Sequence, residues 1–180
     1  MLKLLHAGFS RLWKTRLFWV AAGLLVVIGA AIPVKYFLDN RSGASAWTPD
    51  TACFLYANLV PILLSVLTAL FIGSEYSDGT MRNKCIVGHR RGSIYLANLL
   101  VCMAAGVFLC AAYLIPYLCL ALPLLGSFTA SARTVLLFIA LTLALSFAFV
   151  SCFTLTAMLT QSKAHTAAAC ILLVFSLLLA

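Results

Sequence analysis

Long stretches without a single charged residue recur along the chain, and most are near or above the roughly 20 residues that cross a bilayer as helix. Hydrophobic residues make up 64% of the sequence and charged residues only 9%, whereas a soluble domain carries about a quarter charged residues. These features exclude a soluble enzyme, a nucleic-acid-binding domain and a disordered chain. The runs also lack the period-two alternation of membrane strands. We therefore expect an all-α, polytopic transmembrane helical bundle, forming one domain over residues 1–180.

The uncharged runs predict about five spans. They are Leu17–Val34, Thr51–Ser74, Ile94–Leu118, Thr134–Ser162 and a last run, Thr166–Ala180. The third run continues uncharged beyond Leu118, but Pro116, Pro123 and several hydroxyl residues interrupt it, so we expect an outer loop or short interfacial helix there. The last run would extend about 22 Å as helix, less than the roughly 30 Å hydrocarbon core. We expect the natural chain to continue past Ala180.

The basic residues predict the orientation in the membrane. With a cytosolic N-terminus, nine of the twelve lie in cytosolic segments: Lys3, Arg11, Lys14, Arg16, Arg82, Lys84, Arg90, Arg91 and Lys163. The outer segments then hold only Lys35, Arg41 and Arg133. Because cytosolic loops carry the excess of Lys and Arg in membrane proteins, the N-terminus is expected to be cytosolic.

Residues 1–16 form a basic, amphipathic segment before the first span. Its larger apolar residues fall near one helical face: Leu4, Leu5, Phe9, Leu12 and Trp13. This pattern is typical of an interfacial helix on the cytosolic leaflet. A basic flank that only sets the topology is the compatible, simpler interpretation.

Reactive and charged residues are placed unfavourably for chemistry inside the membrane. The seven cysteines form no CxxC pair, the three histidines are isolated, and no carboxylate stands near a cysteine at ligand spacing. We expect no cofactor and no metal, although a disulfide such as Cys53–Cys119 stays open. No charged residue lies deep in a predicted span, which argues against an ion-coupled carrier. Any uphill transport must therefore draw its energy from a partner.

Small residues recur at four-residue spacing in three spans. The three stripes are Ser65, Ala69 and Gly73; Cys102, Gly106 and Cys110; and Ala140, Ala144, Ala148 and Cys152. Such stripes let helix backbones approach closely. We expect packing within the bundle rather than a dedicated dimer face.

The loop at residues 74–93 is the most informative segment. A helix from Ser74 to Val87 would place Glu75 and Asp78 near its N-terminus, matching the macrodipole, with Asp78 able to pair with Arg82. Met81, Cys85 and Ile86 would give it a partly apolar face, and Gly88 would end it. An ordinary basic loop that sets topology is the alternative.

The sequence of this loop resembles a known family. Its matching residues are Glu75-Tyr76, Gly79-Thr80-Met81-Arg82-Asn83, Gly88, Arg91 and Ile94-Tyr95-Leu96-Ala97. They are similar to the segment after the second span in permease subunits of type-2 ABC exporters, especially small bacterial permeases of lantibiotic immunity and bacitracin export. The basic N-terminal segment and the span order fit as well. The chain departs from the family where relatives often have a lysine in place of Asn98, and in having fewer than six spans.

The resemblance implies a multi-pass subunit of the bacterial cell membrane, working in export and antibiotic resistance. Its cytosolic segment would act as a coupling helix that docks on a separate ABC ATPase subunit. The coupling residues would be Glu75 at the helix start, Gly79 and Thr80 at the close approach, and Arg82 and Arg91 facing acids of the ATPase or lipid phosphates.

The chain is not expected to be an enzyme, because it has no GxxxxGK[ST] phosphate loop of its own. A second permease subunit, identical or a sister protein, would complete the pathway, and no nucleic acid is expected as partner. The apolar interior with scattered polar residues suits a hydrophobic or amphipathic substrate, such as a peptide antibiotic. A non-transporting docking or sensor-partner protein and a small passive channel are the alternative functions.

Overall fold

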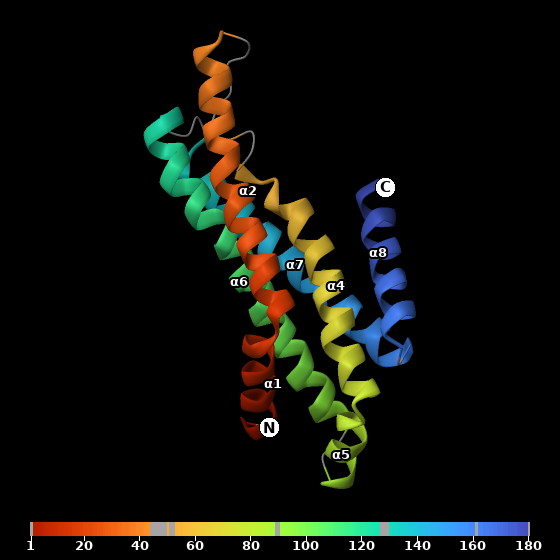
Figure 1. The fold of residues 1–180 in the computed structure, drawn as a ribbon. Helices are drawn as coiled ribbons and strands as arrows, with labels where there is room; N and C mark the ends of the chain where they lie inside the picture. Colours follow the sequence, from red (N-terminus) through yellow and green to blue (C-terminus); the bar gives the residue numbers. More distant parts are fainter. Residues whose placement is uncertain are drawn as a thin grey trace.

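The computed structural model describes residues 2–43, 50, 53–88, 91–126, 130–160 and 162–179, and every regular element in these ranges is a helix. The helices, labelled as in Figure 1, are α1 (Leu2–Lys14), α2 (Arg16–Arg41), α4 (Tyr56–Ser77), α5 (Thr80–Ile86), α6 (Arg91–Leu125), α7 (Ala132–Thr160) and α8 (Lys163–Leu179). The expected all-α fold is confirmed. It follows from the composition, because helices satisfy their backbone hydrogen bonds internally wherever the surroundings are apolar.

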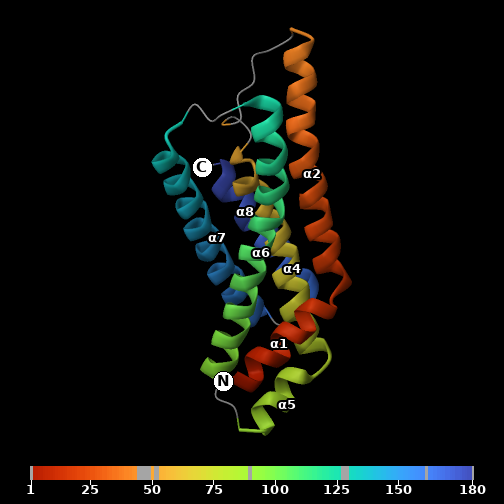
Figure 2. The ribbon, with the colours of Figure 1, turned by 90° about the vertical axis from the view of Figure 1, so that its left-hand side faces the viewer.

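The long helices pack side by side around α4 and α6. The most extensive contact is between α2 and α6, while α4 contacts α6, α7 and α8. Figures 1 and 2 show α1 and α5 together at one end of the bundle, the end where the chain begins. The opposite end is formed by the last turns of α2 and α6. The described parts of the two cytosolic segments expected from the sequence, residues 2–16 and residues 74–88 with 91–93, therefore lie at the same end.

Within the described residues, four helices are long and apolar enough to cross a membrane: α2, α4, α6 and α7. They correspond to the first four expected spans and make the chain a multi-pass helical membrane protein. The fifth expected span corresponds to α8, which has 17 residues. As helix it measures about 25 Å, shorter than a hydrocarbon core of about 30 Å.

The helix of the third expected span does not end near Leu118, where a loop or a separate short helix was expected. α6 runs as one helix of 35 residues past both Pro116 and Pro123 to Leu125. A proline removes one backbone hydrogen bond, but in a membrane-spanning helix the flanking turns and neighbouring helices hold the chain together. α2 packs tightly here, because a Cβ added at Gly29 would lie 2.7 Å from the carbonyl oxygen of Tyr113.

Two of the three stripes of small residues pack inside the bundle as expected. Those of α4 (Ser65, Ala69, Gly73) and α6 (Cys102, Gly106, Cys110) are buried. The expectation is wrong for α7, whose Ala140, Ala144, Ala148 and Cys152 are all exposed. α7 turns a different face inward, formed by Thr142, Ser146, Phe149, Val150, Phe153, Thr154 and Ala157. The inward face of α7 thus combines small and large residues rather than the expected stripe of small ones.

The N-terminal segment is a helix, as expected, but its apolar residues divide between two faces. Leu4, Gly8 and Leu12 are buried, and α1 packs on α6. Gly8 makes this contact close, because an added Cβ would lie 2.8 Å from Cγ2 of Val101. Phe9 and Trp13, which directly follow Gly8 and Leu12 in the sequence and so lie on an adjacent face of the helix, are exposed. α1 is therefore a part of the bundle with one outward apolar face.

Candidate functional site

A buried carboxylate, Glu75, joins four helices at the α1–α5 end of the bundle. Its residue is only 1% exposed and lies in the last turn of α4. Its Oε1 atom pairs with Nη1 of Arg11 at 2.9 Å and with Nζ of Lys84 at 2.6 Å. Its Oε2 atom accepts a hydrogen bond of 2.8 Å from Nδ2 of Asn98. One side chain of α4 thus contacts α1, α5 and α6.

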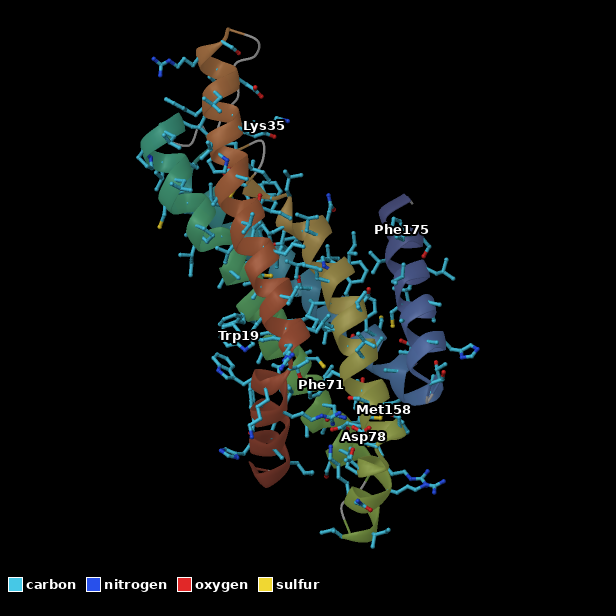
Figure 3. All side chains as sticks on the ribbon, viewed as in Figure 1. Trp19, Lys35, Phe71, Asp78, Met158 and Phe175 are labelled. Carbon is cyan, nitrogen blue, oxygen red and sulfur yellow. The ribbon has the colours of Figure 1, made fainter. Side chains whose placement is uncertain are left out.

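Arg11 reaches this site from α1 and makes several further contacts with α4. Its Nη2 atom donates to the carbonyl oxygen of Phe71 at 3.3 Å and to the hydroxyl of Ser74. Its guanidinium carbon lies 5.1 Å from the centre of the Phe71 ring. A planar guanidinium can donate in several fixed directions while its face contacts an aromatic ring, a combination that favours arginine over lysine. Arg11 therefore fastens α1 to the last two turns of α4. Figure 3 shows Phe71 and Asp78 at this end of α4.

Two contacts bind α5 to the end of α4. Lys84 supplies the ion pair from its second turn, and the Thr80 hydroxyl donates to the carbonyl oxygen of Glu75 at 3.0 Å. The chain turns between the helices at Asp78 and Gly79, where Gly79 has φ +68°. This left-handed conformation strains residues with a Cβ and is typical of glycine just after a helix. Its position explains why α4 stops where it does.

The site has one negative and two positive side chains. Removing a carboxylate from water costs several kcal/mol unless charges and hydrogen-bond donors replace the water, and here both oxygens have such partners. Arg11 and Lys84 keep part of their side chains in solvent, with 30% and 21% exposed, so their excess charge is still hydrated. The arrangement therefore connects four helices by ion pairs and a hydrogen bond.

The structure places the five predicted coupling residues in different environments. Glu75 and Thr80 lie together in the α4–α5 junction, and Gly79 forms the turn between them. Arg82 and Arg91 are exposed, and neither takes part in an ion pair among the described residues. The expected continuous helix from Ser74 to Val87 is wrong, because Gly79 divides it. Glu75 consequently ends one helix and does not begin the next.

The expected pair of Asp78 with Arg82 is also wrong. Asp78 lies in the turn before α5, where its Oδ1 atom accepts a hydrogen bond of 3.3 Å from the hydroxyl of Ser77. Both ion pairs between described residues use Glu75. The spacing rule for charged pairs applies within one helix, and the turn at Gly79 takes these two residues out of it.

Sequence reasoning missed the role of the three partners of Glu75. The sequence marks Asn98 only as a position where the similar permeases often have a lysine, and Lys84 and Arg11 only as basic residues that indicate topology. No spacing rule could identify Arg11, which lies 64 positions away, because only the packing of α1 on the bundle brings it there.

The far side of α5 presents an exposed apolar tip. Ile86 is 81% exposed and Val87 75%, with exposed Arg82 and Asn83 on the preceding turn. Met81, expected on the outward face, is buried instead, and the Cys85 side chain, also assigned to that face, lies outside the described residues. Gly88 has φ +92° just after α5, as expected for the residue that ends this helix. Among the large apolar residues whose exposure the structure describes, Ile86 and Val87 are the most exposed.

The described residues contain no group of three histidine, cysteine or acidic side chains close enough to hold a metal ion. Cys53 and Cys119, which the sequence left open as a disulfide, are both free thiols. Comparison of the chain with known protein families, with curated proteins and with solved structures finds no match. The function must therefore be argued from the membrane-spanning helices and the Glu75 site.

Proposed function

We propose that this chain is the membrane-spanning subunit of an ATP-driven type-2 ABC exporter, resident in a bacterial cell membrane with its N-terminus cytosolic and about five spans. Two such subunits, identical or sister proteins, would form the pathway for a hydrophobic or amphipathic substrate, with a peptide antibiotic as one candidate. ATP hydrolysis would take place on a separate ATPase subunit. The proposal joins the family resemblance of residues 75–97 to the geometry of the α4–α5 junction.

One observation carries the proposal: α5 exposes apolar residues at its end while its Lys84 is paired with the buried Glu75 of α4. A helix that transmits force needs an outer surface for the ATPase and a firm connection to the spans. Ile86, Val87 and Arg82 supply the outer surface, since they are exposed at the end of the bundle. Lys84 and Thr80 supply the connection through Glu75.

The Glu75 site also indicates how movement of α5 would spread. Glu75 belongs to α4, while Arg11 and Asn98 connect it to α1 and α6. A push on α5 would thus act on three helices together, because their charged and amide contacts share one carboxylate. In this proposal Glu75 is a positioning residue inside the bundle, and Arg82 and Arg91 are the candidates for direct contact with the ATPase.

Copurification with surface variants tests the proposal. The chain is purified in mild detergent from its native membranes, and copurifying proteins are identified by mass spectrometry and assayed for ATPase activity. A stoichiometric ATPase subunit is expected, and the double variant Ile86→Asp, Val87→Asp should lose it, because charge on the tip would prevent apolar docking. The matched control is Leu38→Asp, an exposed leucine near the other end of α2, which should retain the subunit.

Three results would separate the possible functions. An ATPase that copurifies and is lost only with the α5 variant supports the exporter subunit. Copurification of a protein without a nucleotide-binding motif, lost in the same variant, would replace the proposal by the docking-protein function. A chain that purifies alone and conducts solutes without ATP after reconstitution would instead identify a passive channel.

A further inference from the structure

An aromatic and basic face covers the outside of α1 and the start of α2. Phe9, Trp13 and Trp19 are exposed there, with exposed Lys14 and Arg16 beside them. A shallow hollow of about 340 Å³ lies on this face and is lined by Phe9, Ser10, Trp13 and Lys14. Figure 3 shows Trp19 near the start of α2, at the edge of the bundle. The Glu75 site does not use any of these side chains.

The two indole rings of this face are held in place by contacts with each other and with α6. Nε1 of Trp19 donates a hydrogen bond of 2.9 Å to the carbonyl oxygen of Trp13, and the two indole rings meet edge to face at 5.1 Å. Both rings also contact Phe108 of α6, with centroid distances of 5.7 and 6.2 Å. On the other side of α1, Arg11 is tied to α4. The indoles thus form an ordered surface on a fixed helix.

The charged residues of this face are all basic, which favours an anionic ligand. The chain has only four acidic residues, Asp39, Asp50, Glu75 and Asp78, and none of them belongs to α1 or the first turns of α2. Lys14 and Arg16 immediately precede the uncharged run that begins at Leu17, so they mark the boundary between polar and apolar surroundings. Tryptophan, with an apolar ring and one N–H donor, prefers the same boundary.

We propose that this face binds an anionic phospholipid of the bilayer. The headgroup phosphate would meet Lys14, Ser10 and Arg16, and the upper part of an acyl chain would lie along Phe9 and Trp13. Basic side chains at such a boundary extend toward the headgroups while their stems cover apolar surface. The inference goes beyond the exporter function and does not depend on it.

Quenching of tryptophan fluorescence by brominated lipids tests the proposal. The chain has three tryptophans, so a Trp47→Phe background leaves Trp13 and Trp19 as the only tryptophans, excited selectively at wavelengths where tyrosine does not absorb. The full chain is reconstituted in phosphatidylcholine bilayers containing equal mole fractions of brominated phosphatidylglycerol or brominated phosphatidylcholine. We expect the anionic lipid to quench more strongly, with a relative association constant raised about fivefold for each participating basic residue.

Charge variants decide whether the preference belongs to this face. Lys14→Gln with Arg16→Gln should abolish the preference while quenching by the neutral lipid continues. The matched control, Lys35→Gln with Arg41→Gln, removes two exposed cations from the far end of α2 and should leave the preference unchanged. Equal quenching by both lipids, or a preference that survives loss of Lys14 and Arg16, would overturn the proposal. Quenching by neither lipid would overturn it too, and would indicate a protein partner on this face.

Discussion

Replacing the buried carboxylate of Glu75 by the neutral, isosteric amide should destabilise the fold substantially. Glu75→Gln leaves Arg11 and Lys84 without their counter-charge and turns an amide donor toward donors already present. Removing one partner of a fully buried ion pair costs roughly 3–5 kcal/mol. Both cations are partly exposed here and can regain water, so the cost should be lower, about 2–3 kcal/mol.

The measurement is reversible unfolding in mixed micelles of a mild detergent with increasing sodium dodecyl sulfate, followed by circular dichroism and tryptophan fluorescence. Asp78→Asn is the matched control, because it removes the same charge three positions further on from an exposed side chain that forms no ion pair among the described residues. Its unfolding midpoint should match that of the unaltered chain. Equal midpoints for Glu75→Gln and Asp78→Asn would refute the reasoning, since the buried network would then contribute nothing to stability.

The remaining predictions concern the same junction and the close contact at Gly29, and each is checked by the same unfolding measurement. Arg11→Gln combined with Lys84→Gln should cost about 1–2 kcal/mol more than the sum of the single changes, because both cations neutralise one oxygen; simple additivity would show that they do not share it. Gly29→Ala should destabilise by about 1–3 kcal/mol, because its Cβ meets the backbone oxygen of Tyr113, whereas Gly23→Ala in the same helix, with open space around it, should be neutral or stabilising. Gly79→Ala should lower the free energy of unfolding by roughly 1–2 kcal/mol, because Gly79 has a left-handed backbone. Gly92→Ala, at the start of α6, should leave the free energy of unfolding unchanged, and equal effects of the two changes would contradict the assigned turn.

Much of the fold could be predicted because the bilayer imposes its own length scale. An uncharged apolar run of about 20 residues has the length of a membrane-spanning helix. The helices α2, α4, α6 and α7 were therefore predictable from the absence of charge alone. The ends of the helices were less predictable. Pro116 and Pro123 would end a helix in water, yet α6 continues past both to Leu125, because neighbouring helices hold it.

The Glu75 site was only partly predictable. The turn residues Gly79 and Thr80 carry local signals, since glycine after a helix and a hydroxyl at the next helix start are properties of short segments. The neighbours of Glu75 carry none. Arg11 and Asn98 reach it from α1 and α6, and their meeting depends on how three helices pack, which no local spacing records.

By itself, the sequence determined the class of the protein, because the length of the apolar runs and the scarcity of charge require a helical membrane bundle. The distribution of basic residues also predicted that α1 and the segment containing α5 lie on the same side, and the structure places both at one end. Only the tertiary structure decided what those charges do. It buried one acid between helices, assigned it two cations and an amide, and left Ile86 and Val87 outside. The physical reason is that hydropathy acts on each segment alone, whereas ion pairing acts between segments that only packing brings together.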